Sequence, residues 1–171
     1  MFDLPRYHKL LALADCVVNI APDLEAKADI IRNAIKLAQA IGIETPKVAI
    51  LAAVETVTPK MQATLDAAAL CKMAERGQIT GGVLDGPLAF DNAISPVAAA
   101  AKGIQSPVAG QADILLVPDL EAGNMLAKQL ASLGGAESAG IVLGLRVPMA
   151  LTSRAGTVPV LRNRCGKRLS K

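Results

Sequence analysis

The chain has 171 residues, of which 52% are hydrophobic and 19% are charged, a composition that fits one globular domain with an aliphatic core. Charged residues interrupt every apolar run before the ~18 residues that a membrane-spanning helix needs, and the first residues lack the pattern of a signal peptide. The net charge of +3 arises at the C-terminal end, since residues 1–155 carry 13 basic against 15 acidic side chains. We therefore expect a cytoplasmic protein that binds neither membrane nor nucleic acid.

Strand-like and helix-like segments alternate along the chain. Aliphatic runs predict strands at 10–20, 47–53, 83–84, 112–117 and 141–145. Apolar residues at helical spacing predict helices at 24–41, 59–76, 92–102 and 122–133. This alternation predicts an α/β fold with a mainly parallel sheet and helices on both of its faces.

Glycine and proline mark the ends of the predicted helices. Gly42, Gly77 and Gly103 each follow a helix, as is typical of helix C-termini. Pro96 falls inside the segment 92–102, where it is compatible with a helix only in the first turn.

The cysteines and the single histidine give no sign of a metal site. Cys16, Cys71 and Cys165 are widely spaced, without a C-x-x-C pair, and are predicted to be ordinary thiols rather than disulfide partners or zinc ligands. His8 is predicted to lie at the surface, so a Ser-His or Cys-His nucleophile has little support.

Ligands of open α/β sheets bind at the carboxyl ends of the strands. The loops there are therefore the candidate binding segments: 21–23, 54–58, 85–91, 118–124 and 152–154. None of them carries the glycine pattern of a dinucleotide-binding motif or a P-loop.

Two of these loops contain candidate binding residues that also have a structural explanation. Asp85 and Asp91 bracket a predicted turn and could hold a ligand hydroxyl or amine, but Asp91 is equally a natural N-cap for the next helix. Gly123 and Asn124, near a helix N-terminus, could present N–H groups to an anion or serve only as turn residues.

The last loop places a hydroxyl beside a guanidinium. Ser153 and Arg154 follow an apolar segment. The guanidinium offers a planar fork of donors that matches phosphate oxygens, so this pair is a candidate phosphate site.

Four segments, in order along the chain, resemble the phosphate acetyl/butyryltransferase (phosphotransacylase) family, and most closely its phosphate butyryltransferase-like members. They are KVAILAAVETV at 47–57, TGGVLDGPLAFDNAIS at 80–95, ADILLVPDLEAGNM at 112–125 and LTSR at 151–154. The resemblance runs from about residue 3 to residue 155. It implies a C-terminal portion of such a protein, equivalent to its second α/β domain, with an architecture like that of isocitrate and isopropylmalate dehydrogenases.

The resemblance implies transfer of a short acyl group between coenzyme A and inorganic phosphate, so that acyl-CoA and phosphate give acyl phosphate and CoA. In the family the CoA thiolate attacks the acyl phosphate directly, so CoA is a substrate and no cofactor, metal or protein nucleophile is implied. Arg154 would bind the phosphoryl oxygens, and Ser153 would hydrogen-bond the reacting group in the transition state. The substrate cleft would be lined from this domain by Asp85, Gly86, Pro87, Asp91, Gly123 and Asn124.

The resemblance also implies a homodimer, since the family dimerises through this domain. Family members are roughly twice as long and place the active site between two domains, so we expect the domain 1–155 to fold but to catalyse poorly by itself.

In acetyl-specific relatives, the region after this domain contains an aspartate that is taken as the base for the CoA thiol. Residues 156–171 contain no carboxylate. We predict that they form a basic tail that is non-homologous or disordered.

Two other functions remain open from the sequence. The first is a non-catalytic domain that dimerises or senses acyl-CoA, with Ser153 and Arg154 as ligand contacts. The second is a nucleotide-binding module of the dehydrogenase type, which the missing dinucleotide motif and the missing metal carboxylates disfavour. The preferred acyl chain, whether acetyl, butyryl or branched, is not encoded in any of these motifs.

Overall fold

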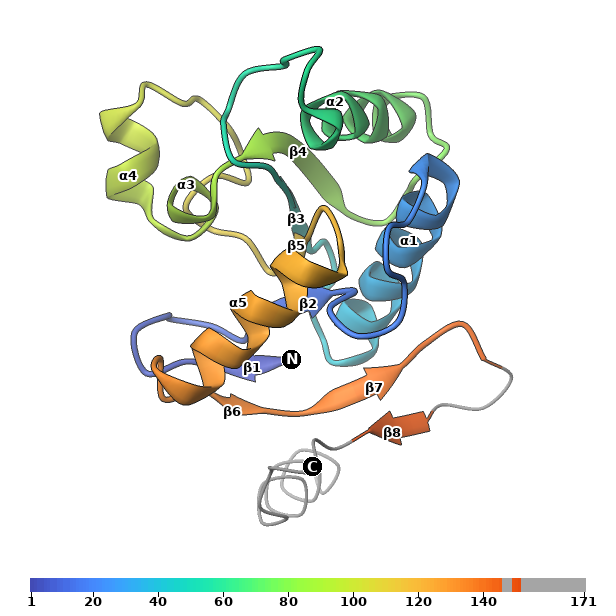
Figure 1. Ribbon diagram of the computed structural model, residues 1–171, viewed down its shortest axis with the longest axis vertical. Helices are drawn as coiled ribbons and strands as arrows, with labels where there is room; N and C mark the ends of the chain where they lie inside the picture. The colour runs from blue at the N-terminus through green and yellow to red at the C-terminus, as the bar shows by residue number, and fades with distance from the viewer. Residues whose placement is uncertain (146–148, 152–171) are drawn as a thin grey trace.

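A computed structural model of the chain describes residues 1–145 and 149–151 (Figure 1). The main sheet contains four strands: β2 (Ala12–Ala14), β3 (Lys47–Leu51), β4 (Val83–Leu88) and β5 (Ile114–Leu116). All neighbours in it are parallel, in the order β2-β5-β3-β4. The predicted parallel sheet is therefore confirmed.

Helices cover both faces of this sheet, as predicted. They are α1 (Leu24–Ala40), α2 (Gln62–Glu75), α3 (Phe90–Ile94), α4 (Pro96–Ala101) and α5 (Leu120–Ser132). On one face, Ile31 of α1 and Leu70 of α2 pack with Ile50 in one apolar cluster. On the other face, Ala93 of α3 belongs to a second cluster with Leu115, against which Leu126 of α5 packs. Among the helices of the described segments, none combines the length and apolarity that crossing a bilayer requires.

The segment predicted as one helix at 92–102 is instead two short helices. Ser95 has an extended backbone, with φ −119° and ψ 114°, and ends α3. Its hydroxyl oxygen accepts a hydrogen bond from the backbone N–H of Ala98 at 3.2 Å, and Pro96 occupies the first turn of α4. The serine therefore caps a new helix where the apolar pattern alone predicts a continuous one.

The strand predicted at 10–20 ends early, at Ala14, because Asp15 folds the following residues back on its carboxylate. This carboxylate accepts hydrogen bonds from the backbone N–H groups of Val17, Val18 and Asn19 at 3.1, 3.0 and 2.9 Å. Burial raises the pKa of Asp15, but these hydrogen bonds outweigh it and hold the pKa below its usual value.

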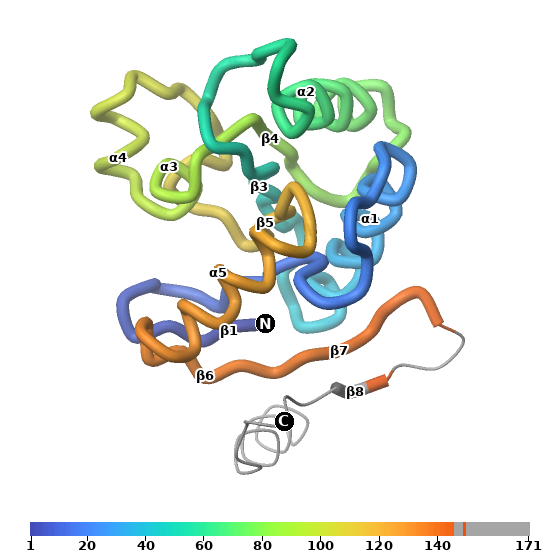
Figure 2. The backbone as a smooth tube through the Cα atoms, in the orientation of Figure 1, coloured from blue at the N-terminus to red at the C-terminus, as the bar shows by residue number. Residues whose placement is uncertain are grey.

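The segment 141–145 is not a fifth strand of the main sheet. β7 (Gly140–Val142) pairs antiparallel with β8 (Met149–Leu151) in a separate sheet. In Figure 2 the chain from β6 (Glu137–Ser138) to β7 runs past the N-terminus, where β6 pairs antiparallel with β1 (Phe2–Asp3). β1 and β6 contain only two residues each, too few to show the alternation that predicts a strand.

A buried ion pair joins α1 and α2, the two helices that pack on the same face of the main sheet. The Lys27 Nζ of α1 lies 2.6 Å from the Asp66 Oδ2 of α2, with both side chains at most 10% exposed. The side-chain amide of Gln62 donates a second hydrogen bond to Asp66 Oδ1 at 2.7 Å. Both carboxylate oxygens of Asp66 are therefore paired, which is what a buried charge requires.

Polar groups tie the N-terminal segment to the amino ends of β3 and β5. The buried Asp113 carboxylate accepts hydrogen bonds from the Lys47 backbone N–H at 2.8 Å and pairs with Lys9 Nζ at 2.7 Å. Beside it, the Tyr7 hydroxyl donates a hydrogen bond to the Ala112 carbonyl at 2.7 Å. Burial, and then the Asp113 charge, raise the pKa of Tyr7 to about 12.

This environment predicts an unusual titration of Tyr7, the only tyrosine in a chain without tryptophan. The folded state favours the neutral phenol, so its contribution to stability is complete below pH 10 and is lost as pH rises toward about 12. Tyrosinate absorbance should show a midpoint near pH 12, or coincide with alkaline unfolding followed by circular dichroism. A midpoint near pH 10 in a protein that is still folded would contradict the buried environment.

Candidate functional site

The carboxyl ends of the four parallel strands meet at one edge of the sheet, which is where such sheets bind ligands. The loops at this edge follow β2, β3, β4 and β5. Among the predicted binding residues, Asp91 follows β4 in α3, while Gly123 and Asn124 follow β5 in α5. The structure therefore brings these three residues to the expected edge.

Asp85, Gly86 and Pro87 do not form the predicted turn, because they lie inside β4. A Cβ on Gly86 would lie 2.8 Å from the Cβ of Ile50 in β3, so glycine allows close contact between the two strands. The Asp85 Oδ1 accepts a hydrogen bond from the Gly86 backbone N–H at 2.8 Å. Gly-Pro is an ordinary turn signal, and here pairing with β3 overrides it.

Gly123 and Asn124 hold α5 against the loop that follows β2. A Cβ on Gly123 would lie 2.7 Å from Val117 Cγ2 and 3.1 Å from Cys16 Cα. The Asn124 side-chain amide donates a hydrogen bond to the Cys16 carbonyl at 3.3 Å. The helix itself is capped by Asp119, whose Oδ1 accepts from the Ala122 backbone N–H at 2.8 Å. These contacts make Gly123 necessary for the shape of this edge.

Replacing Gly123 with alanine should lower the free energy of unfolding by about 1–3 kcal/mol, the usual cost of overpacking. The added methyl group would meet the Cys16 backbone, which cannot move without displacing the loop. Met125→Ala, on an exposed position of the same helix, is the matched control and should change the free energy by less than about 0.5 kcal/mol. Equal urea-unfolding curves for Gly123→Ala and the wild type would show that the contact is not tight.

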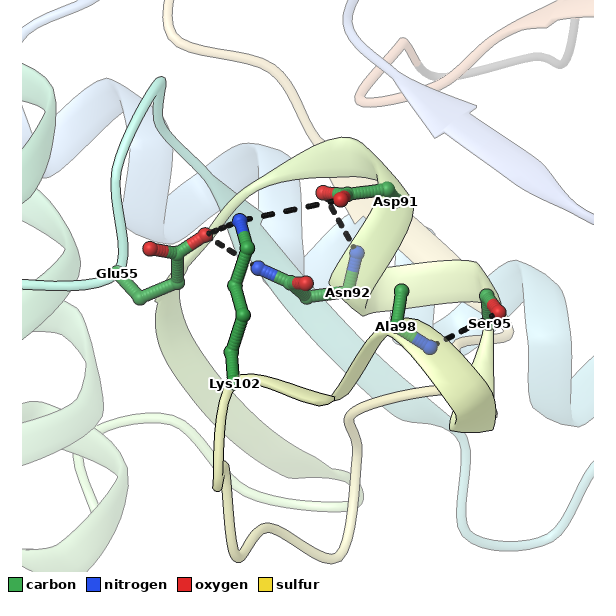
Figure 3. Close-up of polar contacts among 6 residues, drawn as sticks. All are labelled: Glu55, Asp91, Asn92, Ser95, Ala98 and Lys102. Atoms are coloured by element: carbon green, nitrogen blue, oxygen red, sulfur yellow. Dashed lines mark hydrogen bonds and ion pairs between the residues drawn. The ribbon is translucent and has the colours of Figure 1, made fainter. Parts of the chain in front are cut away.

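Asp91 does not cap α3, since the residue at the N-cap is Ala89. Instead, Asp91 lies in the first turn and its Oδ1 accepts from the Asn92 backbone N–H at 2.9 Å. The predicted capping role is therefore wrong. Figure 3 shows that Asp91 belongs to a polar cluster with Glu55, Asn92 and Lys102.

Glu55 is the centre of this cluster, which we call the Glu55 cluster (Glu55, Asp91, Asn92 and Lys102). Its Oε1 accepts hydrogen bonds from Lys102 Nζ at 2.5 Å and from the side-chain amide of Asn92. Lys102 Nζ also lies 3.8 Å from Asp91 Oδ2. The hydrogen bond from Lys102 is the main reason why the pKa of Glu55 is held below its usual value. Glu55 is therefore ionised at neutral pH.

Asn92 is fully buried, and its side-chain amide donates a hydrogen bond to Glu55. Its carbonyl oxygen Oδ1 has no hydrogen-bond partner in the described part of the chain. Leaving a buried acceptor unpaired costs about 1–3 kcal/mol. Asn92 is thus a poor choice for stability alone, and its clearest contribution is to fix the position of Glu55.

No sequence pattern singled out Glu55, Asn92 or Lys102 as a site residue. Glu55 lies in the predicted binding loop 54–58, and Asn92 lies in one of the family-like segments, so a signal was present for these two. Their proximity depends on contacts between residues 37 and 47 positions apart. A single sequence does not reveal such contacts.

Ser153 and Arg154, the predicted catalytic pair, lie outside the described residues. Within residues 1–145 and 149–151, no group of three or more His, Cys, Asp or Glu side chains is arranged to hold a metal ion.

Comparison with known proteins identifies the family. A family model described as phosphate acetyl/butaryl transferase matches residues 1–164, and the chain therefore belongs to the phosphate acetyl/butyryltransferase family. This confirms the resemblance. The matched range extends past residue 155, and the domain boundary predicted there stays a prediction.

The similar proteins agree with this family. The chain is 65% identical over 158 residues to a phosphate acetyltransferase of Rhizobium meliloti, covering 92% of this chain and 50% of the relative. It is 54% identical over 155 residues to a probable phosphate butyryltransferase of Bacillus subtilis, covering 91% and 52%. The crystal structure of a branched-chain phosphotransacylase from Enterococcus faecalis matches with a TM-score of 0.83 and 38% identity, covering 92% of this chain and 56% of that one. The chain thus spans about half the length of the curated relatives it matches.

Proposed function

We propose that this chain forms one side of the active site of a phosphate acyltransferase, which transfers a short acyl group between coenzyme A and inorganic phosphate. The observation that carries the proposal is its 65% identity to a phosphate acetyltransferase over 92% of the chain. The parallel sheet supports it, because its carboxyl edge provides the loops in which such folds bind ligands.

In the proposed reaction, the sulfur of the CoA thiolate attacks the carbonyl carbon of the acyl phosphate. The C–S bond forms, the bond between the carbonyl carbon and the phosphate oxygen breaks, and phosphate leaves with the electron pair. Arg154 binds the phosphoryl oxygens and neutralises the charge that develops on them, while Ser153 hydrogen-bonds the reacting group. Asp91, Gly123 and Asn124 lie at the substrate edge.

The chain alone is expected to bind substrates better than it turns them over. This reaction depends on holding both substrates in the correct relative position, and about half of the length of the relatives is not in this chain.

We also propose that the domain forms a homodimer. Light scattering after size-exclusion chromatography tests this, with a purely monomeric mass as the adverse result.

The proposal is tested by measuring substrate binding and turnover on the same purified chain. Titrations followed by protein NMR should detect binding of acetyl phosphate and of CoA, while a thiol-release assay with acetyl-CoA or butyryl-CoA and phosphate should show little or no turnover. A chain that binds neither substrate would contradict the proposal. Rapid turnover by the chain alone would instead show that it holds a complete site.

A further inference from the structure

The Glu55 cluster contains one carboxylate oxygen of Glu55 to which no side chain of the described residues donates a hydrogen bond. Both side-chain hydrogen bonds to Glu55 end on Oε1. In Figure 3 the second oxygen, Oε2, lies on the side away from Lys102 and Asn92, and no side chain of the described segments donates a hydrogen bond to it. The Glu55 side chain remains 25% exposed. The side-chain hydrogen bonds of the cluster therefore hold one oxygen of Glu55 and leave the other without a side-chain donor.

The position of this oxygen is fixed from two directions. Asn92 is completely buried, so its amide cannot follow a moving carboxylate. Lys102 lies just after α4, and its side chain contacts Glu55 in the loop that follows β3. Since this loop follows the carboxyl end of β3 in a parallel sheet, it lies at the edge where the substrates are expected. An acceptor that is held before the ligand arrives loses little entropy on binding.

The charge of the cluster indicates which kind of ligand group it receives. Glu55 and Asp91 bring two carboxylates, and Lys102 brings one ammonium group to both of them. The cluster is therefore negative overall, and it repels phosphate groups. A neutral N–H or O–H donor is the complementary partner of an ionised carboxylate oxygen.

Coenzyme A has such donors in its adenosine and in its pantetheine arm, but only the arm is free of phosphate charge. Its nucleotide end and pyrophosphate are strongly anionic, whereas its pantetheine arm is neutral and carries amide N–H and hydroxyl groups. We propose that Glu55 binds an N–H or O–H donor of the pantetheine arm, and that Asn92 and Lys102 are positioning residues for Glu55. This inference rests on the proposed function. It means that the pantetheine arm of CoA, which ends in the reactive thiol, binds beside the loop after β3.

The test uses two probes that divide CoA into its parts: pantetheine, kept reduced, and adenosine 3′,5′-bisphosphate. Ligand-detected NMR titrations of the wild-type chain should show binding of pantetheine. Glu55→Ala should weaken this binding about 10-fold or more, the value of a charged hydrogen bond, and leave the affinity for the bisphosphate unchanged. Glu55→Gln, which keeps a neutral acceptor, should have an intermediate effect.

Two further variants separate positioning from folding. Asn92→Leu removes the amide and also the unpaired carbonyl, so the fold should remain stable while pantetheine binding weakens in the same direction as in Glu55→Ala. Glu75→Gln removes a carboxylate that pairs with Lys72 on an exposed part of α2, and it should leave pantetheine binding unchanged.

Unchanged pantetheine affinity in Glu55→Ala would overturn the inference, as would an equal loss for both probes. Absence of pantetheine binding by the wild-type chain would overturn it as well, without affecting the proposed function if CoA and acetyl phosphate still bind. If neither of those substrates binds, the proposed function itself fails.

Discussion

Replacing Lys27 with methionine should lower the free energy of unfolding by about 3–5 kcal/mol, because it leaves the Asp66 carboxylate buried without its counterion. The two side chains are 7% and 10% exposed, and their charged atoms are 2.6 Å apart. Only the hydrogen bond from Gln62 would remain on Asp66. Urea unfolding followed by circular dichroism measures the change.

The double variant Lys27→Met with Asp66→Leu separates the effect of the ion pair from that of lost packing. Replacing both charges by apolar groups removes the uncompensated carboxylate, so most of the stability should return. Lys72→Gln breaks an ion pair whose side chains are exposed, and it should cost less than about 1 kcal/mol. A loss below about 1 kcal/mol for Lys27→Met as well would mean that the Lys27–Asp66 pair is effectively solvated.

Replacing Arg154 with alanine should weaken binding of acetyl phosphate about 100-fold. The expected bidentate contact contributes two charged hydrogen bonds of about 1.5 kcal/mol each, and together they correspond to that factor. Arg154→Lys keeps the charge but loses the planar fork of donors, so it should recover only part of the affinity. NMR titration with acetyl phosphate measures all three proteins.

A matched control for Arg154 lies in the same end of the chain. Arg164 has the same charge but belongs to no family-like motif. Arg164→Ala should leave the affinity for acetyl phosphate within about twofold of the wild type, since a charge that does not contact the phosphate contributes little. Equal losses in Arg154→Ala and Arg164→Ala would indicate general electrostatic attraction rather than a phosphate site.

The sequence predicted the elements whose own residues determine them. Helix α1 is an example: Ile31 and Ile35 recur at helical spacing, and Asp23 caps the helix with a hydrogen bond from Ala26 N–H at 2.9 Å. The helix after β5 follows the same rule, with Asp119 as its cap. Since all four strands of the main sheet alternate with helices along the chain, the parallel sheet could be predicted as well.

The turn predicted at residues 85–87 failed because a contact with a distant segment decides the local structure. Gly86 and Pro87 look like a turn, and only the approach of Ile50 shows why they continue a strand. The candidate site shows the same division. Asp91 was predicted from its position in a loop. Glu55 lies in another predicted loop, but only its contacts single it out there, and Lys102 was identified from its contacts alone.

This chain is proposed to supply one side of a phosphate acyltransferase site. The most direct test mixes it with a separately produced polypeptide that carries the part of the Rhizobium meliloti relative to which it does not align. Thiol release from acetyl-CoA in the presence of phosphate measures turnover. We expect turnover in the mixture and little or none with either polypeptide alone. Rapid turnover by this chain alone, or none in a mixture whose two polypeptides co-elute as a folded complex, would contradict the claim.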